Sequence, residues 1–115
     1  MRFNLPLPPS VNHMYFSGAS RGVRIKTRRY VDWTKESVLI CKEQKYKTLT
    51  GEIDLSIGIY FGRRGRNDID GRLKALLDVL TVAGVYEDDS QVYSMLVNKY
   101  YDKDNPRVEV DVREN

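Results

Sequence analysis

The chain has 115 residues, of which 41% are apolar and 30% are charged. These values are typical of one soluble globular domain that builds a core without disulfides or a structural metal. A single cysteine cannot form an internal disulfide and is typical of a reducing compartment, so we expect a cytoplasmic protein. No apolar run approaches the roughly 18 residues of a membrane span, and prolines interrupt the apolar patch near the start, so neither a membrane segment nor a signal peptide is expected. The net charge of +3 is too small to indicate a nucleic-acid partner by itself.

The first half of the chain predicts a strand, a loop and a helix. Residues 2–7 alternate apolar and polar side chains, which is typical of a half-buried strand. Residues 9–29 show no periodicity and are rich in Ser, Gly and Asn, so we expect a long loop that is functional or mobile. A spacing of three or four residues then predicts a helix over residues 29–47. The positions on its stripe are Val31, Thr34, Val38, Cys41 and Lys45, widened by Trp33 and Ile40.

The second half predicts a strand, a helix and two strands. Residues 52–61 alternate almost perfectly and are the clearest strand of the chain. A helix is predicted over residues 69–83, with Gly84 as its left-handed C-terminal cap. Residues 90–101 and 108–112 are expected to be strands around an Asp-Asn-Pro turn. This order predicts one α+β domain over residues 1–115, in which helices pack on a mixed sheet. The expected buried stripe of the second helix is Ile69, Leu73, Leu76, Leu77 and Leu80.

Residues 63–89 contain an unusual concentration of charge. Asp68 and Asp70 lie two residues apart, where the end of an extended strand would direct both side chains to one side. Three more acids follow at residues 87–89. Asp70 alone is explained by a helix cap, and residues 87–89 alone by a solvated loop. Two acidic clusters at one end of the fold would instead favour a bound cation, because carboxylates that lie together repel one another.

The ligand types indicate which ion would bind. Carboxylate oxygens without neighbouring His or Cys ligands suit Mg²⁺, Mn²⁺ or Ca²⁺ and not Zn²⁺. A calcium-binding loop is excluded, because Arg66 and Leu77 occupy its first and twelfth positions, where acids are required. No phosphate-binding loop, dinucleotide fingerprint or nucleophile elbow is present. A magnesium ion beside basic residues indicates hydrolysis of a phosphodiester, in which one or two ions activate a water molecule.

The basic residues allow two interpretations. Lys74 shares one helix face with Asp70 and Asp78, so it is either a surface ion pair or a cation that stabilises charge on a phosphate. The spacing does not choose between these roles. The other basic residues are either solvated or hold the phosphate backbone of a nucleic acid. These candidate DNA-binding residues are Arg21, Arg24, Lys26, Arg28, Arg29, Arg63, Arg64 and Arg66.

Three runs of residues together form a fairly specific motif, because two acidic blocks and a lysine occur at fixed separations. The runs are Leu5-Pro-Leu-Pro-Pro9-Ser-Val-Asn12, Asp68-Ile-Asp70-Gly-Arg-Leu-Lys74-Ala-Leu-Leu-Asp78 and Gly84-Val-Tyr-Glu-Asp88-Asp89-Ser-Gln-Val92. In these runs the chain resembles the RusA family of Holliday junction resolvases. The resemblance covers essentially the whole sequence.

The resemblance implies a small homodimeric endonuclease that depends on Mg²⁺, with Mn²⁺ as a substitute. Such an enzyme resolves four-way DNA junctions by paired symmetric nicks in recombination and repair. Asp68, Asp70 and Asp89 match the essential metal-binding acids of the family, Asp88 matches a supporting acid, and Lys74 matches the catalytic lysine. The chain departs from the family at Gly71, where Asn is usual, and at Asn67, where a basic residue is frequent.

Three questions stay open from the sequence. The tyrosine-rich segment 93–101 is either a dimer interface, which would suit the two-fold symmetry of a junction, or a sheet face covered by a helix. A second interpretation is that the protein is a non-catalytic nucleic-acid-binding module. In that case bases would stack on the tyrosines at positions 60, 93, 100 and 101, which are Tyr60, Tyr93, Tyr100 and Tyr101. A third interpretation is that the protein is a metal-dependent nuclease whose substrates are flaps or single strands and not four-way junctions.

Overall fold

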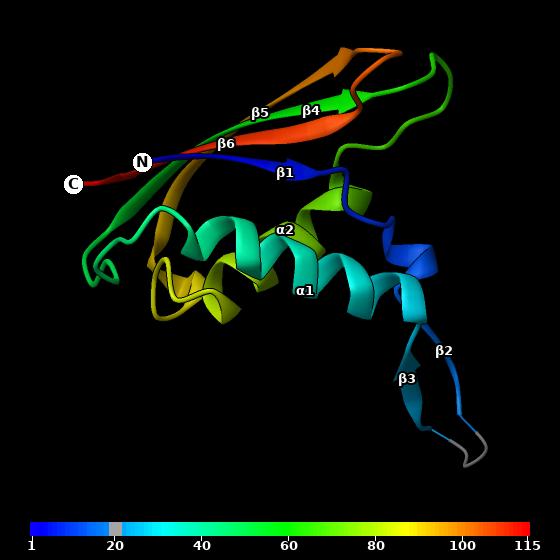
Figure 1. Cartoon of the computed structure of the whole chain (residues 1–115), viewed down its shortest axis with the longest axis horizontal. Helices are drawn as coiled ribbons and strands as arrows, with labels where there is room; N and C mark the ends of the chain where they lie inside the picture. Colours follow the sequence, from blue (N-terminus) through cyan, green and yellow to red (C-terminus); the bar gives the residue numbers. More distant parts are fainter. Residues whose placement is uncertain (19–21) are drawn as a thin grey trace.

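The computed structural model describes residues 1–18 and 22–115, and the predicted phosphate contact at Arg21 lies outside them. Within the described residues, two helices lie on one face of a four-stranded sheet, and a two-stranded hairpin extends away from this body (Figure 1). The prediction of an α+β fold with helices packed on a mixed sheet is confirmed. None of the helices in the described part of the chain is both long and apolar enough to cross a membrane.

The order of strands in the sheet decides where the acidic residues lie. The order is β1-β6-β4-β5, formed by β1 (Arg2–Pro6), β4 (Ile53–Phe61), β5 (Val92–Tyr101) and β6 (Arg107–Glu114). Strand β6 is antiparallel to both β1 and β4, whereas β4 and β5 are parallel. Parallel neighbours need a crossover, which contains helix α2 (Asp70–Val82). The end of β4 and the beginning of β5 therefore lie at opposite ends of the sheet.

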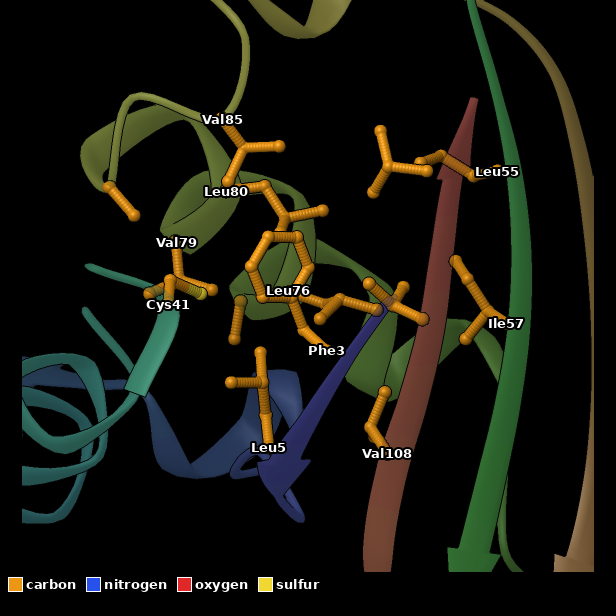
Figure 2. Packing of buried hydrophobic residues seen from close by; sticks show 14 of the residues in the cluster. Phe3, Leu5, Cys41, Leu55, Ile57, Leu76, Val79, Leu80, Val85 and Val108 are labelled. Carbon is orange, nitrogen blue, oxygen red and sulfur yellow. The ribbon is translucent and has the colours of Figure 1, made fainter. Parts of the chain in front are cut away.

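The core lies between the sheet and the two helices. Alternate residues of β4 are buried as predicted, including Leu55 and Ile57. Leu76 and Leu80 of α2 pack against this face, together with Phe3 of β1 (Figure 2). Ala75 and Val79 complete the buried side of α2, while Ile69, Leu73 and Leu77 are only partly buried. After the helix, Gly84 adopts a positive φ of 73°, which confirms its predicted role as a left-handed cap.

Helix α1 differs from the prediction in its length and in its buried face. It runs from Arg28 to Lys42 and not to Lys47, so Lys45 lies beyond its end. Its buried residues are Tyr30, Trp33, Ser37 and Cys41, while Val31, Thr34 and Val38 are only partly buried. The predicted stripe was therefore rotated by about one residue. The aromatic rings explain the rotation, because Trp33 enters the core and its Nε1 donates to the Pro6 carbonyl at 2.9 Å.

The prediction of a loop over residues 9–29 was wrong. A 3-10 turn, η1 (Val11–His13), is followed by an antiparallel hairpin of β2 (Tyr15–Ser17) and β3 (Arg24–Lys26). Each strand has only three residues, and most of their side chains are exposed, so no alternation of buried and exposed positions marks them in the sequence. The hairpin joins the body where the Thr27 amide donates to the Met14 carbonyl at 2.9 Å.

Candidate active site

The loop of residues 62–69, which carries three of the predicted phosphate-binding arginines, is fastened to β5. Lys99 Nζ donates to the Asn67 carbonyl at 3.0 Å, and Asn67 Nδ2 donates to the Arg63 carbonyl at 2.8 Å. The Arg64 guanidinium lies 4.6 Å from the centroid of the Tyr101 ring, which is a cation–π distance. Strand β5 therefore holds the backbone of this loop, while the side chains of Arg63 and Arg64 stay exposed to solvent.

Asp68 and Asp70 lie together in a cavity of about 570 Å³ at this end of the sheet. Strand β4 ends at Phe61, so Asp68 follows a loop and not the strand end that the sequence predicted. Asp70 is the first residue of α2, as expected, but the residue in the capping position is Ile69. Within the described residues, neither carboxylate has an ion-pair partner, and no side chain caps this helix. The helix dipole favours negative charge at this position.

The same cavity contains residues that sequence reasoning did not assign to the site. Its wall includes Ser10 and the three residues of η1, together with Asn67, Gly71 and Arg72, and it also contains Arg66, which the sequence analysis did predict as a phosphate contact. Arg72 donates to the Pro8 carbonyl and lies 5.4 Å from the Phe61 ring centroid. Burial, and then the charge of Arg29, lower the pKa of Arg72. The proline-rich run and its Asn12 were the sequence signal for this wall, but only the fold brings them to Asp68.

Asp88 and Asp89 lie at the opposite end of the sheet, just before β5. Asp88 caps the short helix η2 (Asp89–Gln91), because its carboxylate accepts from the Ser90 amide at 3.1 Å while Gln91 Oε1 accepts from the Asp88 amide at 2.9 Å. The hydrogen bonds from Ser90 lower the pKa of Asp88. Both carboxylates line a second cavity, of about 280 Å³, with Tyr15, Lys26, Tyr30 and Asp78.

One chain does not bring the two acidic pairs together. Asp89 shares its cavity with Asp78, which lies two turns, or about 12 Å along the helix axis, from Asp70. Among the described residues, no group of three or more His, Cys, Asp or Glu side chains is placed to hold a metal ion. Each end still offers at least two carboxylates, Asp68 and Asp70 at one and Asp78, Asp88 and Asp89 at the other. This donor set fits Mg²⁺, which is commonly bound by one or two carboxylates together with water and substrate phosphates.

Lys74 lies on α2 between these two ends. Its Nζ is 3.3 Å from Asp78 Oδ2, so the ion pair that the spacing allowed is formed. The same oxygen of Asp78 accepts a hydrogen bond from the Tyr30 hydroxyl at 3.3 Å. The Lys74 side chain is 52% exposed and is not among the described residues that line either cavity.

The remaining basic residues surround the hairpin and the start of α1. The Arg24 guanidinium lies 4.3 Å from the Tyr15 ring centroid, and Lys26 Nζ lies 5.5 Å from that of Tyr30. Arg28 pairs with Asp32 at 3.1 Å. These side chains and Arg29 are exposed to solvent, so they are accessible to a polyanion. The sequence prediction that they contact phosphate stays a prediction.

Comparison with known proteins places these residues in a family. The family model described as endodeoxyribonuclease RusA matches residues 6–113. A crossover junction endodeoxyribonuclease RusA from Aquifex aeolicus (strain VF5) is 29% identical over 110 residues, which cover 95% of this chain and 85% of the relative. The match includes the loop with Asp68, helix α2 and the turn with Asp88 and Asp89. The chain therefore belongs to the endodeoxyribonuclease RusA family.

Proposed function

We propose that this protein is a Mg²⁺-dependent, structure-selective endodeoxyribonuclease that resolves four-way DNA junctions by paired symmetric nicks in recombination and repair. Family membership supports the class of enzyme, and the name of the Aquifex relative supports the junction as substrate. The observation that carries the proposal is the Asp68–Asp70 pair. Two exposed carboxylates share a cavity with Arg66 and Arg72 at the start of α2, so sites for a cation and for a phosphate adjoin one another.

Asp68 and Asp70 would hold the metal ion, either Mg²⁺ or Mn²⁺. When bound, the ion would activate a water molecule and reduce the negative charge on the scissile phosphate. Arg66 of the loop and Arg72 of α2 would bind the DNA backbone beside it, and Arg63 and Arg64 would extend this contact. Lys74 lies one helical turn after Asp70, from where its ammonium group would stabilise charge that develops on the phosphate.

A homodimer would match the two-fold symmetry of the junction. The tyrosine-rich strand β5 supports this part of the proposal, because it is an edge strand of ten residues whose side chains are largely exposed on both faces. Tyr93 is 69% exposed and Leu96 60%, so no helix in the described part of the chain covers these side chains, although the alternative interpretation required a helix there. An unprotected apolar edge favours pairing with another chain. A second copy could also bring its Asp88 and Asp89 to the Asp68–Asp70 cavity.

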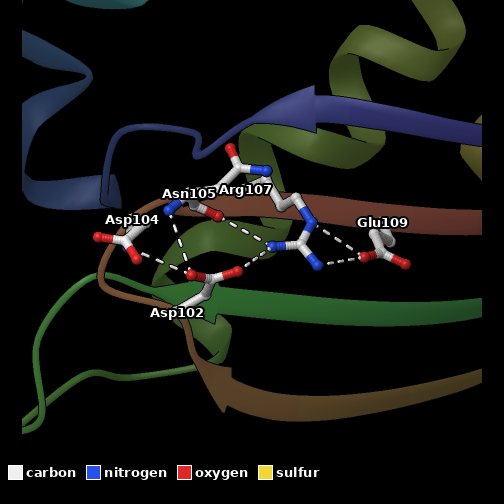
Figure 3. Close-up of polar contacts among 5 residues, drawn as sticks. All are labelled: Asp102, Asp104, Asn105, Arg107 and Glu109. Atoms are coloured by element: carbon white, nitrogen blue, oxygen red, sulfur yellow. Dashed lines mark hydrogen bonds and ion pairs between the residues drawn. The ribbon is translucent and has the colours of Figure 1, made fainter.

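The contacts of Tyr60 and Tyr100 disfavour the non-catalytic alternative, in which these tyrosines stack on bases. The two rings stack on each other at 4.8 Å on the sheet face opposite the helices. The Arg107 guanidinium covers Tyr60 at 3.8 Å and is itself bound by Asp102 and Glu109 (Figure 3). Because the two rings already stack on each other and on Arg107, they are poor platforms for stacking on bases.

Cleavage of a panel of DNA substrates tests the proposal. We expect the wild-type protein with Mg²⁺ to nick a four-way junction at symmetric positions and to leave duplex, flap and single strand largely intact. Asp70→Asn should abolish cleavage while junction binding is retained or strengthened, because a charge that repels phosphate is lost. Preferred cleavage of flaps or single strands would instead identify a nuclease of that class. Metal-independent binding without cleavage would identify a binding module.

A further inference from the structure

The carboxylate partner of Lys74 is held by a second helix. Lys74 Nζ and the Tyr30 hydroxyl both lie 3.3 Å from the same atom, Asp78 Oδ2. Lys74 and Asp78 belong to α2, whereas Tyr30 belongs to α1. One carboxylate oxygen therefore links an exposed ammonium group to a buried side chain of the neighbouring helix.

Tyr30 is fixed by its surroundings. The residue is 4% exposed, and its ring packs edge-on against Tyr15 with 5.8 Å between the centroids. Lys26 Nζ lies 5.5 Å from the ring on the hairpin side. Burial, and then the charge of Asp78, raise the pKa of Tyr30, so the hydroxyl keeps its proton at neutral pH and remains a donor. Asp78 thus receives a hydrogen bond from a side chain that has little freedom to move.

This anchor distinguishes the pair from an ordinary surface ion pair. Two mobile side chains on a helix order each other only weakly, because each loses rotamer freedom. The Arg28–Asp32 pair of α1 has the same spacing, with side chains 89% and 56% exposed. Asp78 is 38% exposed, and its position is fixed from α1 as well as from its own helix. Lys74 is therefore tethered to a fixed acceptor.

We propose that Asp78, held by Tyr30, is a positioning residue that sets where the Lys74 ammonium group lies during DNA cleavage. This inference rests on the proposed nuclease function and on the role of Lys74 in it. The Lys74 side chain has four rotatable bonds, and its backbone lies one helical turn from Asp70. The distance between its ammonium group and a phosphate bound near Asp70 therefore depends on the contact with Asp78. Small displacements of a group that stabilises a transition state have large effects on rate.

A double-mutant cycle tests this role, with single-turnover cleavage of a four-way junction at saturating protein and Mg²⁺. We expect Asp78→Asn to lower the cleavage rate constant by about tenfold and Tyr30→Phe by about threefold, without loss of junction affinity. In the Lys74→Met background, Asp78→Asn should change the remaining rate by less than about twofold, because no ammonium group is left to position. A purely structural role of Asp78 would give the same fold-change in both backgrounds.

Asp111→Asn is a matched control, because Asp111 also forms an ion pair, with Arg113 at 3.4 Å, but lies on β6 of the sheet. Its cleavage rate should equal that of the wild type. If Asp78→Asn does not fold, as judged by its melting curve, the same cycle with Tyr30→Phe decides the question. The inference would be overturned if Asp78→Asn or Lys74→Met cleaved the junction at the wild-type rate. It would also be overturned if the losses in cleavage rate of these two variants were additive in the double variant. Failure of the proposed function would look different, because the wild-type protein itself would not cut the junction.

Discussion

The carboxylates of this protein differ in what already surrounds them. Asp68 and Asp70 are exposed within a cavity and have no ion-pair partner among the described residues. Asp88 instead accepts a hydrogen bond from the Ser90 amide and caps η2. The family resemblance implied that all of these acids belong to one metal-binding group. Their hydrogen bonds now show that Asp88 stabilises its own turn, whatever part it has in binding a metal ion.

Asp88 should therefore contribute to stability in a manner that depends on pH. The hydrogen bonds from Ser90 lower its pKa below the ordinary value of 3.8, so the folded protein favours the ionised form. This contribution is fully present above about pH 4 and is lost as the pH falls through the lowered value. We expect Asp88→Ala to lower the melting temperature at neutral pH, and we expect the difference from wild type to shrink at about pH 2. Glu87→Ala is the control, since Glu87 is exposed and the capping hydrogen bond from the Ser90 amide goes to Asp88.

At the scale of elements, the sequence predicted those whose periodicity reflects burial on one side. The alternation in β4 and the leucines of α2 follow directly from their contact with the core. The hairpin of β2 and β3 was missed because it projects from the body and buries little. In α1, the position of Tyr30 was missed because its burial depends on Tyr15 and Asp78, which are distant in the sequence. Such contacts are set by tertiary packing and leave no local pattern.

The first turn of α2 gives a prediction about Gly71, the position at which the family resemblance led us to expect Asn. A Cβ atom at this position would meet Asp68 Cβ at 4.0 Å, which is an ordinary contact. Gly71→Ala should therefore fit and should raise the free energy of unfolding by about 0.5–1 kcal/mol, because glycine is disfavoured within a helix. Gly71→Asn should raise the free energy of unfolding by less than Gly71→Ala does, and it should retain junction cleavage. Urea unfolding measures the first effect, and a loss of stability in Gly71→Ala would mean that this turn is not helical in solution.

At the scale of the whole molecule, the parallel pairing of β4 and β5 separates the acidic residues. Asp68 and Asp70 follow the end of β4, and Asp88 and Asp89 precede the start of β5. Nine residues of strand span about 30 Å, and the chain returns through α2, whose 13 residues span about 20 Å, and through the segments on either side of it. The family resemblance implied which residues carry the chemistry, and these roles stay predictions, whereas strand direction was not visible in the periodicity of the sequence. A site that uses both pairs would therefore require two copies of the chain.

Mixing two inactive variants tests this arrangement. In a heterodimer of Asp70→Asn and Asp89→Asn chains, a site shared between copies would combine the intact Asp70 of one chain with the intact Asp89 of the other. Differently tagged chains, purified together, should therefore nick one strand of a four-way junction, although neither homodimer cuts. A heterodimer of wild type and Asp70→Asn controls for assembly. If the site lies within one chain, both halves of the mixed heterodimer are inactive, because each chain lacks one acid. If light scattering gives the mass of a monomer, the protein does not form the proposed dimer, and a site shared between two copies is ruled out.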